Sequence, residues 1–348
     1  MSQRVIISTH LEGELVSALA ECEHDKLFVL TDETTREKCL PILKQFYSMR
    51  DAQTIFIPAT DTHKDIESLM AVWKGLQQGG ASRHSCLINL GGGMVTDLGG
   101  FAASTFKRGI NFINIPTTLL AMVDASVGGK TGINFGGLKN EIGVFNDSKF
   151  VILDTEFLKT LDAENICSGY AEMLKHGLIS TEEMWLELVS FDLEKPDLKQ
   201  LQRMVGDSVK VKEGIVEQDP HEMGIRKALN LGHTFGHAFE SWALKRTPIL
   251  HGYAVAFGLI PELYLSVAKT GFPTEKMRET VKFIKEYYGS LPIACDDYDE
   301  LIELMHHDKK NQNGIINFTL LGGIGDIRIN QTATTEEIKE ALDFFREG

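Results

Sequence analysis

The stretch LINLGGGMVTDLGGFAAS, residues 87–104, decides the fold of the first half of this 348-residue chain. Apolar residues up to Leu90 predict a buried strand, three glycines follow directly, and a helix is predicted from Val95 with Asp97 in its first turn. Such a turn is typical of phosphate binding, because the helix N-terminus offers free N–H groups and a partial positive charge. The spacing is not G-x-G-x-x-G, so a tight turn without a ligand stays an open alternative.

The residues around this turn alternate between strand and helix patterns. Helical spacing recurs between short β-branched runs, for example over 35–46 and 64–79. The runs predict strands at 4–8, 26–31, 54–59, 86–90, 111–116 and 149–154. This alternation predicts parallel strands with crossover helices and a ligand crevice at the carboxyl ends of the strands.

After Asp154 the pattern becomes helical. Helices are predicted at 163–180, 197–218, 222–243, 251–270, 274–287 and 297–307, and a late hairpin at 318–321 and 326–329. We therefore expect an α/β dinucleotide-binding domain over 1–154 and a mainly α-helical metal- and substrate-binding domain over 155–348. The active site is expected in the cleft between them.

Composition narrows the class of protein. A net charge of −14, from 35 basic and 49 acidic residues, disfavours binding to nucleic acid or an anionic membrane but allows a small anionic substrate. Five scattered cysteines without C-x-x-C indicate a reducing compartment. The N-terminus has no apolar leader, and the apolar stretch 250–269 is interrupted by Pro261 and Glu262, so we expect a soluble cytoplasmic protein.

A second glycine-rich run, residues 116–140, follows the fifth predicted strand. We interpret it as a long functional loop rather than a solvated one, because long glycine-rich loops with apolar content are usually functional. Its lysines suit anionic groups. The side chains it offers are Thr117, Thr118, Asp124, Lys130, Asn134, Lys139 and Asn140.

The helical half contains a candidate metal site. His233 and His237 are four residues apart, so one helical face can use both for a metal, or one for a metal and one for proton transfer, although a coincidental pair stays open. Glu172 lies in an apolar helix with Lys175 at i, i+3, a costly position for an acid unless it is paired or metal-bound. With His251, which opens the next apolar helix, Glu172 and His233 predict a three-ligand zinc site with an open position.

A polar stripe accompanies these histidines. Arg226, Asn230, His233 and His237 fall at i, i+4, i+7 and i+11 of the predicted helix, where an amphipathic core helix would be apolar. Apolar neighbours weaken the alternative of a solvated face. Further charges that suit an anionic substrate are Lys210, Lys212 and Glu222.

Taken in order, these blocks resemble the 3-dehydroquinate synthase family, in the sugar-phosphate cyclase group related to iron-containing and glycerol dehydrogenases. The resemblance runs from about Arg4 to Gly325. It rests on GGGMVTDLGGFAAS, FKRGINFINIPTTLLAMVDASVGGKTGIN, KNEIGVF, AEMLKHG, IRKALNLGHTFGHAFE, LHGYAVAFG and MHHDKK.

The resemblance implies cofactors and site residues. NAD would be held by Asp32, Asp61, Lys64, Gly91, Gly92, Gly93, Asp97, Thr117, Thr118 and Lys139. Zn2+, with Co2+ as the alternative, would be held by Glu172, His233 and His251. A phosphorylated sugar-acid substrate would meet Asp124, Lys130, Asn140, Lys175, Lys212, Arg226 and Asn230, with Arg108 reaching it across a homodimer interface. Glu222 and His237 would move protons, and Lys309 or Lys310 would approach the substrate.

Two positions depart from the family pattern. The family has Gly-Glu before the motif containing Lys64, where this chain has Thr60 and Asp61, and Asp61 can still accept a bond from a ribose hydroxyl. The family has Glu after His-Gly, where this chain has Tyr253. The second change removes a charge near the metal and leaves room for a related cyclase.

The resemblance implies a carbon–oxygen lyase that converts 3-deoxy-D-arabino-heptulosonate 7-phosphate to 3-dehydroquinate and phosphate, in the shikimate route to aromatic amino acids. The implied steps are transient oxidation by NAD, phosphate elimination, re-reduction and intramolecular aldol closure. The alternatives are another sugar-phosphate cyclase, such as one like 2-deoxy-scyllo-inosose synthase, and an NAD- and metal-dependent polyol dehydrogenase. A non-catalytic nucleotide-binding protein is disfavoured by the polar stripe.

Overall fold

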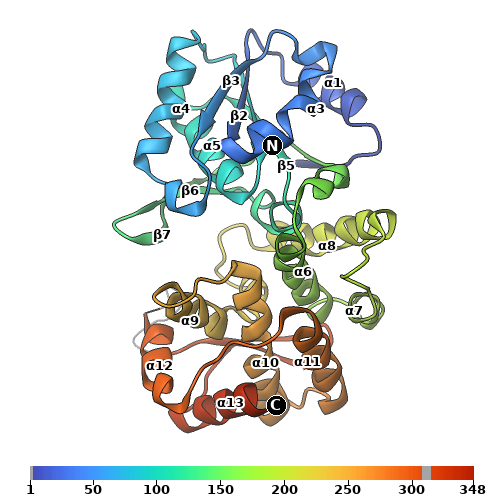
Figure 1. The fold of residues 1–348 in the computed structure, drawn as a ribbon, viewed down its shortest axis with the longest axis vertical. Coiled ribbons are helices and arrows are strands. Elements are labelled where there is room, and N and C mark those ends of the chain that lie inside the picture. The colour runs from blue at the N-terminus through green and yellow to red at the C-terminus, as the bar shows by residue number, and fades with distance from the viewer. Residues whose placement is uncertain (1–2, 308–314) are drawn as a thin grey trace. The chain divides into compact units, whose positions relative to one another are not determined.

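The computed structural model describes residues 3–307 and 315–348. The chain forms two compact units, one of Met1–Asp162 with Asp197–Val209 and the other of Ala163–Pro196 with Lys210–Gly348 (Figure 1). The domain boundary near Asp154 and the cleft, both predicted from the sequence, stay proposals.

The first unit is built on a parallel sheet. Its strands stand in the order β1-β8-β5-β4-β2-β3, and every neighbouring pair is parallel. Their bounds are β1 Arg4–Ile7, β2 Leu27–Asp32, β3 Gln53–Ile57, β4 Cys86–Gly91, β5 Asn111–Pro116 and β8 Phe150–Leu153. The α/β fold class predicted from the alternating pattern is confirmed.

Helices of this unit lie beside the sheet: α1 Leu11–Glu21, α2 Glu33–Lys38, α3 Leu40–Lys44, α4 Ile66–Gln78 and α5 Gly93–Thr105 (Figure 1). α4 shows why the sequence forms a helix there. Asp65 caps it by accepting from the Ser68 N–H at 2.9 Å, and Leu69, Val72 and Leu76 recur at helical spacing and are buried.

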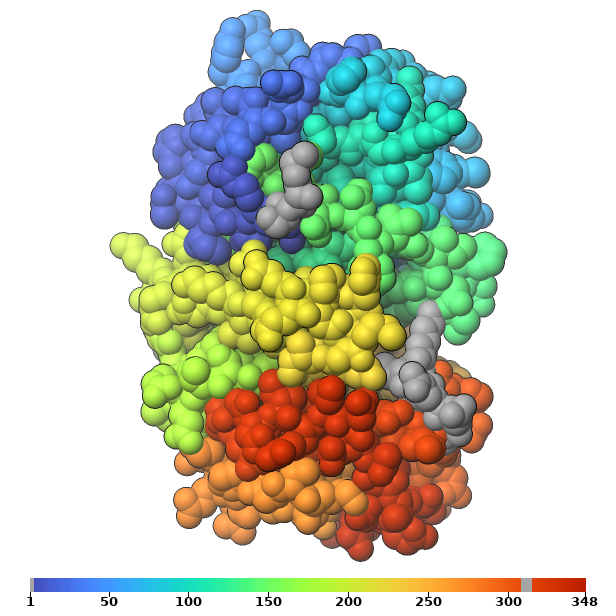
Figure 2. Space-filling model, turned by 180° about the vertical axis from the view of Figure 1, so that it is seen from behind, coloured from blue at the N-terminus to red at the C-terminus, as the bar shows by residue number. Residues whose placement is uncertain are grey.

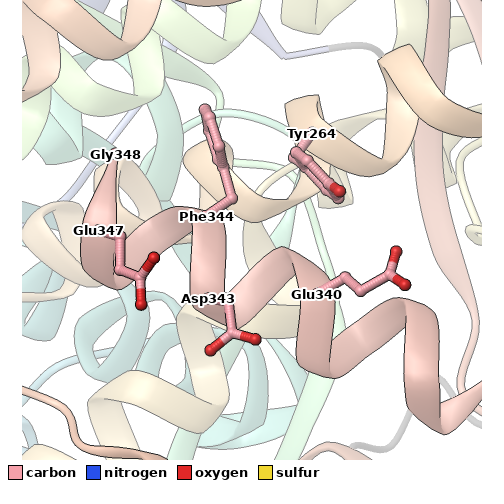
Figure 3. Close-up of a pocket in the computed structure, with 6 residues that line it drawn as sticks. All are labelled: Tyr264, Glu340, Asp343, Phe344, Glu347 and Gly348. Carbon is pink, nitrogen blue, oxygen red and sulfur yellow. The ribbon is translucent and has the colours of Figure 1, made fainter.

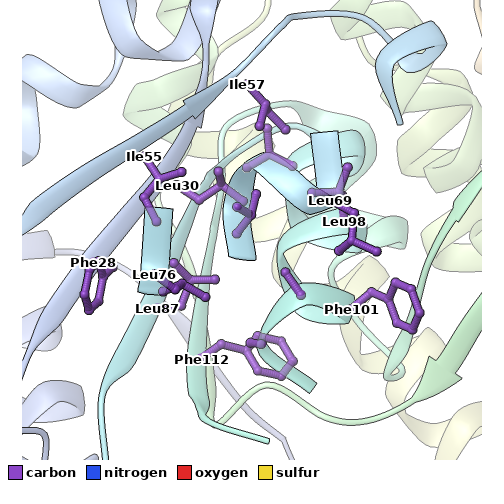
Figure 4. Close-up of a cluster of buried hydrophobic side chains, with 14 of the residues drawn as sticks. Phe28, Leu30, Ile55, Ile57, Leu69, Leu76, Leu87, Leu98, Phe101 and Phe112 are labelled. Atoms are coloured by element: carbon purple, nitrogen blue, oxygen red, sulfur yellow. The ribbon is translucent and has the colours of Figure 1, made fainter. Parts of the chain in front are cut away.

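One apolar cluster joins the sheet to α4 and α5. Figure 4 shows Phe28, Leu30, Leu87 and Phe112 from the strands meeting Leu98 and other helix residues. Each fully buried Leu or Phe contributes about 1.5–3 kcal/mol relative to exposure. This packing fixes β4 and α5 and therefore the turn between them.

The second glycine-rich run is not a loop throughout, so that prediction was wrong. A short helical turn, Ala121–Ala125, leads into an antiparallel hairpin of β6 Lys130–Phe135 and β7 Leu138–Phe145. Glycines at 128, 129, 136 and 137 have positive φ. They form turns before and within the hairpin, because glycine adopts this conformation without steric cost.

The second unit is mainly helical. Its elements are α6 Ala163–Leu178, α7 Glu182–Val189, the second half of α8 Leu198–Gln218, α9 His233–Leu244, α10 His251–Thr270, α11 Thr274–Tyr288, α12 Tyr298–His306, α13 Thr335–Glu347 and a hairpin of β9 Phe318–Gly323 with β10 Asp326–Gln331. The antiparallel pairing of β9 and β10 confirms the late hairpin. α7 and α13 were not predicted. No helix in the described ranges is long and apolar enough to cross a membrane.

The single helix predicted over 222–243 was wrong. A 3-10 turn, Ile225–Asn230, comes first, Gly232 follows with φ +80, and α9 begins at His233. Left-handed backbone at Gly232 cannot continue a right-handed helix. The i, i+4, i+7, i+11 stripe therefore does not exist as one helical face, although its residues stay close along the chain.

Candidate functional site

Three ligand-type side chains of the helical unit converge. Glu172 comes from α6, His233 from the start of α9 and His251 from the start of α10, and their ligand atoms lie within 4.8 Å of one another. Oε1 of Glu172 is 3.4 Å from Nε2 of His233 and 3.5 Å from Nε2 of His251. Two imidazoles and one carboxylate form a donor set typical of catalytic zinc.

Close helix packing makes this convergence possible. A Cβ added to Gly252 on α10 would overlap the carbonyl oxygen of Ser168 on α6. A Cβ added to Gly258 would overlap the carbonyl oxygen of Gly232, directly before α9. Glycine at these two positions therefore lets the ligand-bearing helices approach at backbone contact.

Both histidines are oriented by their second ring nitrogen. Nδ1 of His233 lies 3.1 Å from the carbonyl oxygen of Leu231, and Nδ1 of His251 lies 3.2 Å from Oε2 of Glu240. A proton on each Nδ1 leaves the Nε2 lone pair directed at a metal position. Glu240 was not predicted, although it lies three residues after His237 and seven after His233, on the same face of α9.

The carboxylate at the centre is buried yet ionised. Glu172 is 0% exposed, and Lys175, 1% exposed, donates to its Oε2. Burial acts to raise the pKa of Glu172, but the charges of Lys175 and the contacts with His233 hold that pKa well below its usual range. Lys175 therefore keeps a charged carboxylate inside an apolar helix.

The two imidazoles differ in pKa. Burial lowers the pKa of His233 to about 4, which makes its ring neutral and able to bind a metal near neutral pH. Burial also acts to lower the pKa of His251, but its contacts with the carboxylates of Glu172 and Glu240 outweigh burial and raise that pKa to about 10. A metal would therefore have to displace the Nε2 proton of this ring.

The donor set fits a divalent cation. Oε1 of Glu172 is buried and makes no hydrogen bond, although two imidazole nitrogens face it. A buried acceptor without a donor costs about 1–3 kcal/mol. A cation among the three atoms would satisfy it. His237 lies beside this centre, with its ring centroid 5.3 Å from that of His233 and 6.0 Å from that of His251.

Further residues predicted for the site lie in the segment before α9. Nδ2 of Asn230 donates to Oε1 of Glu222 at 2.9 Å, so the structure brings these two together. Arg226 is 2% exposed and donates through Nη1 to the carbonyl oxygen of Pro220 at 2.6 Å. Asp219, which sequence analysis missed, accepts the backbone N–H groups of Met223, Gly224 and Arg226 and shapes this segment.

The predicted nucleotide turn lies in the α/β unit. β4 ends at Gly91, and α5 begins at Gly93 with Gly92 as an N-cap that offers no side chain. The helix starts two residues earlier than predicted, so Asp97 lies beyond its first turn, which is a correction. Thr117 is buried and donates its N–H to the Gly91 carbonyl at 3.0 Å.

A buried lysine, Lys64, links two other predicted residues near this turn. Nζ of Lys64, 4% exposed, donates to Oδ2 of Asp97 and to Oδ1 of Asn140, both at 2.5 Å. An exposed ion pair joins Lys139 to Asp61 at 3.6 Å. Lys139 of β7, predicted to bind NAD, therefore lies beside the 61–64 turn, which carries two further NAD candidates, Asp61 and Lys64. Asn140, predicted to bind the substrate, contacts Lys64 of the same turn.

Several other predicted residues have local structural roles. Asp32 caps α2 through the Thr35 N–H at 2.7 Å, and Thr118 accepts the Ala121 N–H at 3.2 Å. Arg108, with φ +68, and Lys130 are exposed, and Asp124 and Lys212 are at least partly buried. Lys309 and Lys310 lie outside the described residues.

Tyr253, the departure from the family pattern, packs its ring edge-on to Tyr288 with centroids 5.1 Å apart.

A shallow pocket of about 390 Å³ lies elsewhere in the helical unit, along α13. Figure 3 shows its carboxylates Glu340, Asp343 and Glu347 beside Tyr264 and Phe344, whose rings stack at 5.0 Å. Three carboxylates repel a phosphate, so this pocket does not suit the anionic substrate expected from the sequence.

Solved structures share this architecture. A 2-epi-5-epi-valiolone synthase from Streptomyces hygroscopicus, with NAD+ and Zn2+ bound, has a TM-score of 0.87 at 26% identity, covering 100% of this chain and 97% of that one. A 2-deoxy-scyllo-inosose synthase in complex with carbaglucose-6-phosphate, NAD+ and Co2+ has a TM-score of 0.85 at 23% identity, covering 99% and 96%. An iron-containing alcohol dehydrogenase has a TM-score of 0.68 at 15% identity, covering 99% and 98%. The fold is that of sugar-phosphate cyclases and iron-containing dehydrogenases.

Sequence comparison is more specific. Residues 54–168 match the 3-dehydroquinate synthase N-terminal family, and residues 169–311 match the 3-dehydroquinate synthase C-terminal family. A 3-dehydroquinate synthase of Parabacteroides distasonis is 56% identical over 347 residues, covering 99% of this chain and 98% of that protein. One of Streptococcus pyogenes is 34% identical, covering 97% and 95%. The chain belongs to the 3-dehydroquinate synthase family.

Proposed function

We propose that this chain is a 3-dehydroquinate synthase, a lyase that converts 3-deoxy-D-arabino-heptulosonate 7-phosphate to 3-dehydroquinate and phosphate. The observation that carries the proposal is the arrangement of two oriented imidazole Nε2 atoms around the unbonded, buried Oε1 of Glu172. Membership of the family supplies the substrate and the reaction.

The metal would be held by Glu172, His233 and His251, and NAD by the Gly91–Gly93 turn with the residues around Lys64. When bound, a divalent cation polarises a substrate hydroxyl and NAD accepts and later returns a hydride. Lys175 maintains the charge of Glu172 throughout, because its ammonium group is buried against the carboxylate. Metal dependence is part of the proposal and is supported by the donor set.

Proton movement falls to groups beside this centre. The ring of His237 lies next to both metal-site imidazoles, so we assign it a proton-transfer role at the substrate. The Glu222 carboxylate, which accepts from Asn230, is the second candidate. Asn230 fixes the direction of that carboxylate, since an oriented base needs its hydrogen-bond partner in place.

Recognition of the phosphorylated substrate would use basic side chains. Lys175, Lys212 and Arg226 are each less than a tenth exposed in the helical unit. Partly desolvated cations form stronger charge-assisted hydrogen bonds to a phosphate or carboxylate than exposed ones do. Lys130 and Asn140 of the α/β unit belong to the same proposal.

A homodimer and a cytoplasmic location complete the proposal. β7 is exposed along all eight residues and lies on the green part of the surface in Figure 2. Leu138, Ile142 and Val144 of this strand are exposed. An apolar edge strand is a typical pairing surface, which supports self-association. Sedimentation velocity tests this, and a monomer at micromolar concentration would contradict it.

The cysteines support the proposed cytoplasmic location. All five are free thiols, as expected in a reducing compartment.

A substrate panel tests the function. With catalytic NAD and Zn2+, the heptulosonate phosphate should release inorganic phosphate over many turnovers. Phosphate release from glucose 6-phosphate alone would instead establish a different cyclase. NADH accumulating in proportion to a polyol, without phosphate release, would establish a dehydrogenase.

A further inference from the structure

A second buried carboxylate lies on the helix that begins with His251. Glu262 of α10 is 0% exposed and accepts three backbone N–H groups, from Gly232 at 2.6 Å, Thr234 at 2.9 Å and Phe235 at 3.3 Å. The sequence signalled it only as an acid that interrupts an apolar stretch, where an unpartnered carboxylate would be costly.

These donors form the start of α9. The first N–H groups of a helix have no partner in their own helix, and the N-cap here is Gly232, which has no side chain to supply one. Glu262 therefore caps α9 from a neighbouring helix. Its negative charge also stabilises the positive end of the α9 dipole.

The capped segment contains a metal-site residue. His233 lies between Gly232 and Thr234, which both donate to Glu262. Its Nδ1 is 3.1 Å from the carbonyl oxygen of Leu231, one residue before the capped backbone. The direction of the His233 ring is therefore set by backbone that Glu262 holds in place.

The same helix supplies another metal-site residue. His251 is the first residue of α10, and Glu262 follows about three helical turns later. α10 thus presents one imidazole directly and holds the backbone that carries the other. The close approach at Gly258 holds the two helices together between these points.

We propose that Glu262 is a positioning residue for the metal centre, acting on His233 through the capped backbone of α9. This inference rests on the proposed metal site. A cap with only a structural role would lower stability and leave the metal affinity of the folded protein unchanged. Positioning predicts that affinity and coordination geometry change as well.

The test is titration of the purified full chain with Co2+ alone, followed by its visible spectrum and by calorimetry. In Glu262→Gln an amide NH2 replaces one acceptor and faces an N–H donor, so we expect Co2+ affinity to fall roughly 10-fold or more and the spectrum to change. Glu262→Ala should show a larger loss, in the same direction.

The matched control is Ser266→Ala. Ser266 lies one turn further along α10 and is 0% exposed. Its hydroxyl accepts the Leu321 N–H at 3.0 Å and donates to the backbone carbonyl of Glu262 at 2.7 Å, so the substitution leaves the Glu262 carboxylate in place. This variant should melt earlier than wild type yet bind Co2+ with wild-type affinity and spectrum.

Each outcome decides between the claims. Wild-type affinity and spectrum in Glu262→Gln, with a lower melting temperature, would show a purely structural cap and overturn the inference while the metal site stands. Failure of the wild-type chain to bind Co2+ would overturn the metal site itself, and the inference with it. If Glu262→Ala does not fold, the Gln variant still decides.

Discussion

Lys175 donates to the carboxylate of Glu172 one helical turn away, and both side chains are almost completely buried, at 1% and 0% exposed. The pair is not an ordinary surface i, i+3 bridge. Its other carboxylate oxygen faces two imidazoles. One ion pair therefore connects the stability of the helical unit to the charge of its proposed metal centre.

Lys175→Met should strongly destabilise the metal-free protein. The substitution keeps the length of the side chain but leaves a buried carboxylate without its cation, which typically costs 3–5 kcal/mol. Urea unfolding followed by circular dichroism measures it. The conservative control Lys159→Met removes an exposed partner of Glu156 and should cost less than about 1 kcal/mol. An equal decrease in the free energy of unfolding in the two variants would contradict the interpretation that the buried ion pair stabilises the protein.

His233→Ala should lose bound metal and turnover together, because it removes one of three ligand atoms. NAD binding should largely survive, since the glycine turn belongs to the other unit. Elemental analysis of the metal content checks the first expectation, and calorimetry of NAD binding checks the second. Full metal occupancy in this variant would exclude His233 as a ligand.

Lys64→Ala should weaken NAD binding by roughly 10- to 100-fold, as expected when a buried charge-assisted hydrogen-bond donor is removed. Lys64 connects Asp97 and Asn140 beside the predicted turn, so its loss disturbs both. Lys44→Ala is the control, because Lys44 of the same unit donates to the Ala52 backbone carbonyl at 2.9 Å, and neither residue is a candidate for the nucleotide site. An unchanged NAD affinity in Lys64→Ala would remove this residue from the nucleotide site.

Asp154 gives a pH-dependent prediction. Burial raises the pKa of Asp154 above its ordinary 3.8, although hydrogen bonds from Glu156 and Ser8 oppose the shift. A carboxyl with a raised folded-state pKa favours folding when protonated, so its contribution is complete below 3.8 and is lost as pH rises through the raised value.

Asp154→Asn should therefore stabilise the protein at about pH 7 and give little gain at about pH 4. The amide oxygen can still accept the Glu156 N–H that Asp154 accepts at 2.9 Å. Melting temperatures of both proteins across this range test it. A difference that does not vary with pH would contradict the charge-burial explanation.

Two basic residues proposed for the substrate should behave differently when removed. Either Lys130→Ala or Arg226→Ala should weaken substrate binding or turnover by on the order of 10- to 100-fold. Lys130 is exposed, so its loss should leave the melting temperature unchanged. Arg226 is buried and donates to Pro220, so Arg226→Ala should also melt earlier. If Arg226→Ala has wild-type kinetics and a lower melting temperature, Arg226 has only a structural role.

Much of this fold could be predicted from local patterns. Six strands and the late hairpin follow from short β-branched runs, and Leu69, Val72 and Leu76 show why α4 could be recognised. Local patterns were insufficient where a glycine was compatible with two different backbone structures. In the run 116–140 it formed turns around a hairpin instead of a loop, and Gly232 ended one helical segment before the next.

The sequence by itself determined the alternating α/β half, the helical half and the residue types of the metal centre, because periodicity and burial cost act over a few neighbouring residues. Only the tertiary structure decided that Glu172, His233 and His251 converge, since they come from three helices whose approach depends on backbone contact at Gly252 and Gly258. It alone decided that Glu262 caps α9. Contacts between distant segments depend on how whole helices pack, and no local pattern encodes that geometry.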